Sequence, residues 1–102
     1  MTKKIFSVAI IAAAFLLSGC ASYHLRQGNR LYKDLAYSMA IEEYQKGLSK
    51  KENAAARIKL AESYRKMNNL QKAEEEYAKV VLLPEAEPIH KLRYGQLLMR
   101  SG

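Results

Sequence analysis

The second half of the chain alternates apolar and polar positions with the period of an α-helix. Two apolar stripes of this kind follow one another: Ile58, Leu60, Ala61 and Tyr64, and then Leu70, Ala73, Tyr77, Val80 and Val81. Residues three and four apart share one side of a helix, so each stripe predicts an amphipathic helix. Asn68-Asn69 lies between the stripes and predicts a tight turn, because asparagine tolerates left-handed backbone.

No segment after Cys20 shows the sustained apolar–polar alternation of a β-strand. The apolar residues in this part of the chain have helical spacing throughout. Pro84 ends the second stripe, since proline cannot continue a helix. We therefore expect an all-α fold. The expected helices are Ser22–Lys33, Tyr37–Leu48, Ala54–Met67, Leu70–Leu83 and Pro88–Arg100.

The chain also repeats itself, with a period typical of stacked helix-turn-helix repeats. The shift that carries Lys33 onto Lys66 superposes six identical pairs: Lys33 on Lys66, Ala40 on Ala73, Glu42 on Glu75, Glu43 on Glu76, Tyr44 on Tyr77 and Lys46 on Lys79. A further shift, longer by one position, pairs similar side chains: Ile58 with Leu92, Lys59 with Arg93, Ala61 with Gly95 and Lys66 with Arg100. We call either shift one repeat.

The repeated residues resemble the tetratricopeptide (TPR) repeat. That pattern has a small residue in its helix A, a large apolar residue three positions later, and an alanine and an aromatic residue in its helix B. The matching residues are Gly28, Leu31, Ala40 and Tyr44, and then Ala61, Tyr64, Ala73 and Tyr77. The resemblance implies a TPR-like helix-turn-helix solenoid of about two and a half repeats, in which Gly28, Ala61 and Gly95 let helices approach closely and Tyr44 and Tyr77 fill the space between repeats.

The chain departs from the TPR pattern at Arg57, where a tryptophan is usual, and at Val80, where a small residue is usual. The alternative is a pair of unrelated helical hairpins. The fifth expected helix is a helix A without its helix B, and its apolar residues make a poor cap for a solenoid. These are Leu92, Tyr94, Leu97, Leu98 and Met99. We therefore expect the chain to be the front part of a longer protein.

The start of the chain has the order of a secretory signal: Lys3 and Lys4, an apolar run over residues 5–17, the small Ser18-Gly19, and Cys20. Leu17-Ser18-Gly19-Cys20 resembles the lipobox of bacterial lipoproteins. The resemblance implies cleavage before Cys20 and a diacylglycerol group on its sulfur. The alternative, a transmembrane anchor, needs about 20 apolar residues.

We therefore expect residues 1–19 to be a lipoprotein signal peptide and residues 20–102 to be the TPR-like region. Ala21 follows the cysteine where inner-membrane lipoproteins of Gram-negative bacteria carry aspartate. The resemblance thus implies a lipid anchor at the outer membrane, facing the periplasm. Cys20 is the only cysteine, so no disulfide forms within one chain.

Charge suggests where a partner binds. The formal net charge is +7, and loss of Lys3 and Lys4 leaves 15 Lys and Arg against 10 Asp and Glu. Export argues against nucleic acid and leaves anionic lipid head groups, envelope glycans or an acidic protein face as partners. Six cations fall at two equivalent positions of the repeat, which are separated by two helical turns. This basic ladder comprises Arg26, Lys33, Lys59, Lys66, Arg93 and Arg100.

In the resembling fold this side of helix A lines a concave groove. We therefore expect the ladder to point into solvent and bind a partner, with Asn29, Tyr32, Arg65 and Gln96 nearby. The alternative is charge that serves solubility alone. The run Glu74-Glu75-Glu76 is expected to be a solvated helix face, with Glu75 pairing with Lys79 one turn later.

No catalytic constellation is evident. His24 and His90 are the only histidines, no cysteine or paired aspartate completes a metal site, and no glycine-rich phosphate loop occurs. We expect neither enzymatic activity nor any cofactor apart from the covalent lipid on Cys20.

The expected function is a lipid-anchored scaffold for protein–protein interactions in the bacterial cell envelope. The chain resembles the N-terminal part of lipoproteins that join TPR repeats to a β-propeller and a peptidoglycan-binding OmpA-like domain, some of them tied to secretion. One alternative is a TPR lipoprotein of outer-membrane protein or secretin assembly. Another is the docking arm of an enzyme.

Overall fold

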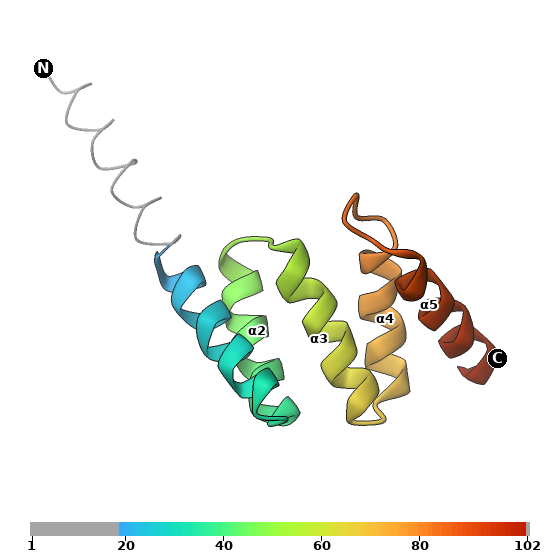
Figure 1. Cartoon of the computed structure of the whole chain (residues 1–102), viewed down its shortest axis with the longest axis horizontal. Helices are drawn as coiled ribbons and strands as arrows, with labels where there is room; N and C mark the ends of the chain where they lie inside the picture. The colour runs from blue at the N-terminus through green and yellow to red at the C-terminus, as the bar shows by residue number, and fades with distance from the viewer. Residues whose placement is uncertain (1–18, 102) are drawn as a thin grey trace, which may run out of the picture.

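The computed structural model describes residues 19–101, and these residues form helices and connecting turns without any strand. A helix over residues 19–33 is followed by α2 (Tyr37–Lys50), α3 (Ala54–Lys66), α4 (Leu70–Val80) and α5 (Pro88–Ser101). The all-α prediction is therefore confirmed for this part of the chain (Figure 1). The predicted signal peptide lies outside the described residues, apart from Gly19.

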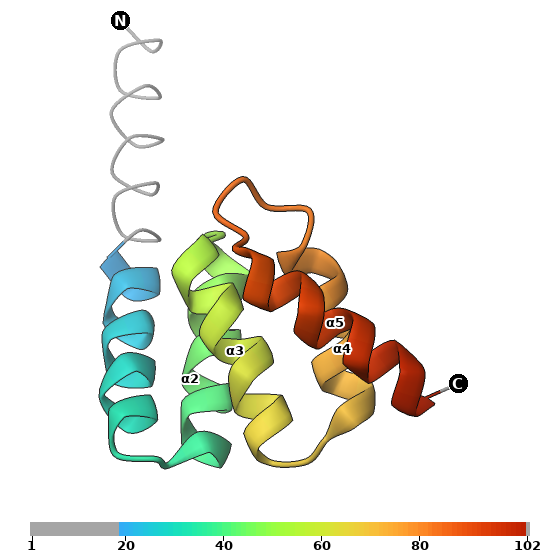
Figure 2. The same ribbon diagram turned by 45° about the vertical axis from the view of Figure 1, so that its right-hand side comes forward.

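Consecutive helices run in opposite directions and stand side by side in a row, as Figures 1 and 2 both show. From α2 onward, the backbones that approach closely belong to α2 and α3, to α3 and α4, and to α4 and α5. Each helix therefore covers its neighbours in the sequence. The result is a row of helical hairpins followed by α5.

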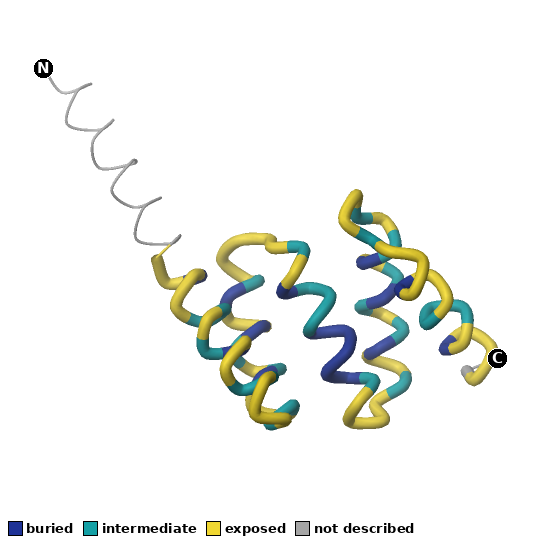
Figure 3. The backbone as a smooth tube through the Cα atoms, in the orientation of Figure 1, coloured by how far each residue is buried: buried dark blue, intermediate teal, exposed yellow. Residues whose placement is uncertain are grey.

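The core is a cluster of buried alanine, tyrosine, leucine and valine residues that pack between neighbouring helices. Figure 3 marks the buried positions along the backbone. Ala40, Ala73, Tyr44 and Tyr77 are all 0% exposed, which confirms that the repeated alanines and tyrosines face the interior. Ala61 is equally buried. Burying a tyrosine ring removes a large apolar area from water, so these two rings contribute much of the packing between helices.

Two glycines allow a close approach of neighbouring elements. A Cβ atom on Gly28 would lie 2.7 Å from the Tyr44 ring, and one on Gly47 would lie 2.5 Å from the Leu25 side chain. The role predicted for Gly28 is therefore confirmed. Gly95 differs, because a Cβ atom there would meet nothing within 4 Å. The predicted close approach at Gly95 is thus not made within residues 19–101.

The two hairpin turns use the same backbone device. Asn68 has φ 59°, and Leu35, which stands one repeat earlier, has φ 61°. The tight turn predicted at Asn68-Asn69 is therefore confirmed. Asn69 also caps α4, since its side-chain oxygen accepts a hydrogen bond from the Lys72 amide at 3.3 Å. Asn53 caps α3 in the same way, through the Ala56 amide at 2.9 Å.

The helix boundaries differ most from those predicted at two places: the first helix already includes residues 19–21 although a start at Ser22 was predicted, and α4 ends at Val80 rather than Leu83. After Val80 the chain tightens to three-residue turns, in which the Leu82 amide donates to the Lys79 carbonyl and the Leu83 amide to the Val80 carbonyl, so that α4 is shortened. Pro84 explains this shortening, because a residue that precedes proline is displaced from helical geometry.

Candidate partner-binding face

Polar side chains from three helices form a continuous cluster, which we call the polar seam. Two belong to the helix over residues 19–33, three to α3 and one to α5. In chain order they are Asn29, Tyr32, Lys59, Glu62, Arg65 and Arg93. The seam contains three cations and one carboxylate, so it carries a net positive charge.

The first half of the seam is centred on Asn29. Its side-chain oxygen accepts hydrogen bonds from the Tyr44 hydroxyl at 2.8 Å and from Lys59 Nζ at 3.2 Å. The same Lys59 Nζ lies 5.9 Å from the centroid of the Tyr32 ring, within the range of a cation–π interaction. Lys59 is therefore held against the protein.

The second half is centred on Glu62, whose carboxylate is buried with the residue only 7% exposed. The Tyr77 hydroxyl and Arg93 both donate to Oε1, and Arg65 Nη2 donates to Oε2 at 2.7 Å. A buried carboxylate needs such partners, because its desolvation is otherwise costly.

The ionisation of this cluster follows from its contacts. Burial, the largest single effect, would raise the pKa of Glu62, but the hydrogen bonds from Tyr77, Arg65 and Arg93 and the charge of Arg65 together lower it. Burial, followed by the hydrogen bond to Glu62, raises the pKa of Tyr77 to about 12. Glu62 is therefore the anion and Tyr77 the neutral donor over the physiological range.

The two halves of the seam are equivalent. Glu62 stands one repeat after Asn29, Tyr77 one repeat after Tyr44, and Arg93 one repeat after Lys59. In each half, a tyrosine from the covering helix and a cation from a later helix donate to the same acceptor oxygen. The sequence repeat is thus also a repeat of side-chain contacts.

A second contact also recurs. His24 Nδ1 lies 2.7 Å from Glu43 Oε2, and at the equivalent place in the next hairpin Arg57 Nη1 donates to Glu76 Oε2 at 2.8 Å. The hydrogen bond with His24 lowers the pKa of Glu43. Each pair joins the two helices of one hairpin. Arg57, at the position where TPR repeats usually carry tryptophan, makes this contact in the second hairpin.

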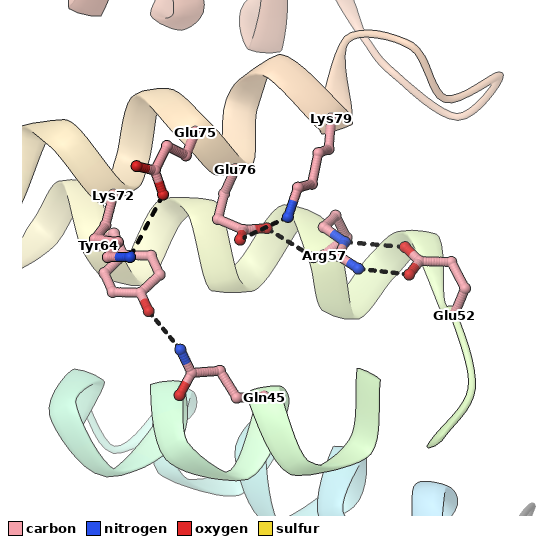
Figure 4. A network of polar contacts seen from close by, with 8 residues as sticks. All are labelled: Gln45, Glu52, Arg57, Tyr64, Lys72, Glu75, Glu76 and Lys79. Carbon is pink, nitrogen blue, oxygen red and sulfur yellow. Dashed lines mark hydrogen bonds and ion pairs between the residues drawn. The ribbon is translucent and has the colours of Figure 1, made fainter. Parts of the chain in front are cut away.

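Arg57 belongs to a wider polar network (Figure 4). Its guanidinium also donates twice to Glu52, at 3.0 and 2.6 Å, and these bonds raise the pKa of Arg57. The Gln45 amide donates to the Tyr64 hydroxyl at 2.6 Å, which joins α2 to α3. The network fastens neighbouring helices together.

The expectation of a fully solvated acidic run is wrong for Glu76. Its side chain is only 13% exposed because Arg57 packs against it. Lys79 also pairs with Glu76, at 3.4 Å, rather than with Glu75, whose partner is Lys72 at 3.5 Å (Figure 4). The spacing of charges along one helix could not show that Arg57, from the neighbouring helix, would pair with Glu76 and bury it beside Lys79.

The structure divides the basic ladder into two groups. Four of its cations are exposed and have no polar partner among residues 19–101: Arg26, Lys33, Lys66 and Arg100. The expectation that all six point into solvent is wrong for Lys59 and Arg93, which are half-buried and bound to Asn29 and Glu62. Glu62 was the residue that sequence reasoning missed, although its place one repeat after Asn29 pointed to it.

The remaining candidate residues lie as follows. Cys20 is an exposed free thiol near the start of the described helix. His90 is buried, and its Nδ1 accepts a hydrogen bond from the Glu87 amide at 2.9 Å. Within residues 19–101, no cluster of three or more His, Cys, Asp or Glu is arranged to hold a metal ion. In the same range, no helix has the length and apolar character to span a membrane.

Comparison of the chain with protein-family models gives no match, and comparison with curated proteins gives none either. Its function is therefore inferred from its own residues and their geometry.

Proposed function

We propose that the protein is a lipid-anchored, TPR-like scaffold of the bacterial cell envelope, which holds an acidic segment of a partner protein along the polar seam. The observation that carries this proposal is the repeated contact set, in which side chains one repeat apart make the same bonds in successive hairpins. Stacked helical repeats of this kind present extended surfaces for binding other proteins.

The exposed cations supply the charge for binding. Lys33 and Lys66 are on the helices that carry the seam, directly after Tyr32 and Arg65. Because neither has an intramolecular partner among the described residues, both are available to an acidic ligand. Exposed charges of one sign accelerate encounter with an oppositely charged partner.

The anchor is proposed from Leu17-Ser18-Gly19-Cys20, and an exposed Cys20 thiol is compatible with acylation. Each buried methylene of an acyl chain contributes about 0.8 kcal/mol, and two or more chains hold a protein stably at a membrane. A thioether-linked diacylglycerol at Cys20 would attach the helical region to the bilayer at the start of its first helix.

The test is a pull-down from envelope extract with a matched pair of charge reversals. Lys33→Glu with Lys66→Glu should lose the partners and the salt dependence of their capture, since exposed charges are screened over about 10 Å at 0.1 M salt. Lys50→Glu with Lys51→Glu changes the net charge equally at exposed positions that are not adjacent to seam residues in the chain, and should retain the partners. Equal recovery by both double variants would contradict binding along the seam.

A further inference from the structure

The residue proposed to carry the lipid is joined closely to the fold. Cys20 lies near the start of the helix over residues 19–33, and the next residue, Ala21, is only 1% exposed. Ala21 packs against α2, because a Cβ atom built on Gly47 would lie 3.2 Å from the Ala21 carbonyl oxygen. Among the described residues, no linker therefore separates Cys20 from the row of helices, and the anchor decides which end of the row meets a membrane.

The row of helices has two ends, and Cys20 belongs to one of them. Figures 1 and 2 both show the start of the helix over residues 19–33, the α2–α3 connection and the α4–α5 connection at one end, which we call the anchor end. The tight turns over residues 34–36 and 67–69 lie at the opposite end, which we call the turn end. A bilayer that holds a lipid attached to Cys20 therefore faces the anchor end.

Two adjacent lysines at the anchor end have no partner in this part of the chain. Lys50 is the last residue of α2 and Lys51 follows it, and both are exposed. Neither side chain makes an ion pair or a hydrogen bond with another residue of the range 19–101. The adjacent Glu52 does not neutralise them, because its carboxylate accepts hydrogen bonds from Arg57 at 3.0 and 2.6 Å. Both positive charges are thus available to a ligand.

These lysines lie beside the attachment point. Gly47, which touches Ala21, stands three residues before Lys50, so the two share one side of α2 and are separated by less than one helical turn. The Lys51 amide donates to the Gly47 carbonyl at 3.1 Å, which holds Lys51 at the end of the same helix. A lipid at Cys20 would therefore bring both lysines to the membrane surface.

We propose that Lys50 and Lys51 bind the phosphate groups of anionic phospholipids next to the anchor, so that the row stands on the membrane on its anchor end. This inference rests on the lipid anchor of the proposed function. The lysine ammonium is a compact charge with three donors and binds phosphate well. Its attraction to an anionic surface acts only within about 10 Å at 0.1 M salt, and attachment through Cys20 supplies that proximity.

The other charges of the anchor end predict a tilt. The α4–α5 connection carries Glu85 and Glu87, which are exposed and form no ion pair within residues 19–101. An anionic surface repels them, so the first hairpin should lie closer to the membrane than this connection. Lys33 and Lys66 immediately precede the tight turns and therefore belong to the turn end. They are held away from the head groups, where a protein partner can reach them.

The test measures which residues lie near the head groups. The intact, isotopically labelled protein is placed in lipid nanodiscs that contain phosphatidylcholine with a nitroxide on its head group, which speeds the relaxation of nearby amides. In discs that also contain phosphatidylglycerol, residues 49–53 should relax roughly twofold faster, or more, than residues 67–69 and 85–87. In discs of phosphatidylcholine alone this difference should shrink, because the anionic surface is absent.

Charge reversal makes the test specific. Lys50→Glu with Lys51→Glu should remove the effect of phosphatidylglycerol on residues 49–53, since each lysine near an anionic surface favours contact about fivefold. Lys33→Glu with Lys66→Glu changes the net charge equally at the turn end and should keep the effect. Salt at about 1 M, which screens charges over about 3 Å, should act on the wild type as the first double variant does.

The intact mass of the protein separates this proposal from the anchor itself. A mass without acyl groups would contradict the anchor, and the exposed Cys20 thiol, then free, is coupled to a maleimide phospholipid in the same discs for the same measurement. Equal relaxation of residues 49–53 with and without phosphatidylglycerol would overturn the lysine contact for either attachment. So would an equal loss of the effect in both double variants, which would assign it to net charge alone.

Discussion

At the scale of single residues, two glycines at equivalent positions of the repeat would respond differently to the addition of a methyl group. Gly28 and Gly95 stand at equivalent positions, two repeats apart. A methyl group at Gly28 would enter the buried Tyr44 ring, whereas at Gly95 it would meet nothing. Close packing was predicted at both glycines, because each is a small residue at the same position of the repeat. A small residue alone does not show which side chain lies opposite it.

We expect Gly28→Ala and Gly95→Ala to have opposite effects on the free energy of unfolding. Overpacking against the immobile Tyr44 ring should cost about 1–3 kcal/mol at Gly28. Alanine at Gly95 should instead stabilise by up to about 1 kcal/mol, the difference in helix propensity between the two residues. Urea titrations followed by far-UV circular dichroism measure both. Stabilisation by Gly28→Ala would contradict the observed packing.

At the scale of elements, apolar spacing and turn residues predicted the helices well, and errors arose where side chains from distant helices intervene. Asn68 signals its turn because asparagine tolerates positive φ. Leu35 occupies the equivalent turn, but a leucine gives no signal of positive φ, so its left-handed backbone was not predicted. Glu62 escaped the sequence reasoning because its donors, Tyr77 and Arg93, come from two later helices.

The turn at Leu35 offers a stabilising substitution. Leu35 is 70% exposed, so its side chain contributes little packing, yet its left-handed backbone costs roughly 1 kcal/mol because its Cβ atom crowds the following carbonyl. Leu35→Asn should therefore raise the free energy of unfolding by up to about 1 kcal/mol. Asn68→Leu is the reciprocal change and should lower it. Thermal unfolding of the two variants tests the pair, and a loss of stability in Leu35→Asn would contradict the turn geometry.

At the scale of the whole molecule, Glu62 joins three helices, since it lies on α3 and accepts from Tyr77 on α4 and Arg93 on α5. Its pKa is lowered in the folded chain. A carboxyl group of this kind adds stability above its unfolded pKa of about 4.3, and this stability is lost as the pH falls through the folded pKa. The row of helices should therefore loosen on acidification.

We expect the midpoint of urea unfolding in the wild type to fall as the pH drops below about 4.3, the unfolded pKa of a glutamate. Glu62→Gln should be less stable than the wild type near pH 7 and should show a shallower fall, because its amide does not titrate. Glu43 and Glu52 also have lowered pKa values and remain in both proteins, so the difference between the two curves isolates Glu62. Parallel curves would contradict its role.

The bonds of Lys59 to Asn29 and of Arg93 to Glu62 each span helices that are separated by one helix in the chain. Both bonds lie along the same side of the row of helices and limit how far the helices on that side can move apart. Bending that separates the helices on this side must stretch both bonds, whereas bending in the opposite direction does not strain them. An acidic ligand that captured either cation would break one of these bonds, and binding of the proposed partner would then change how readily the row bends.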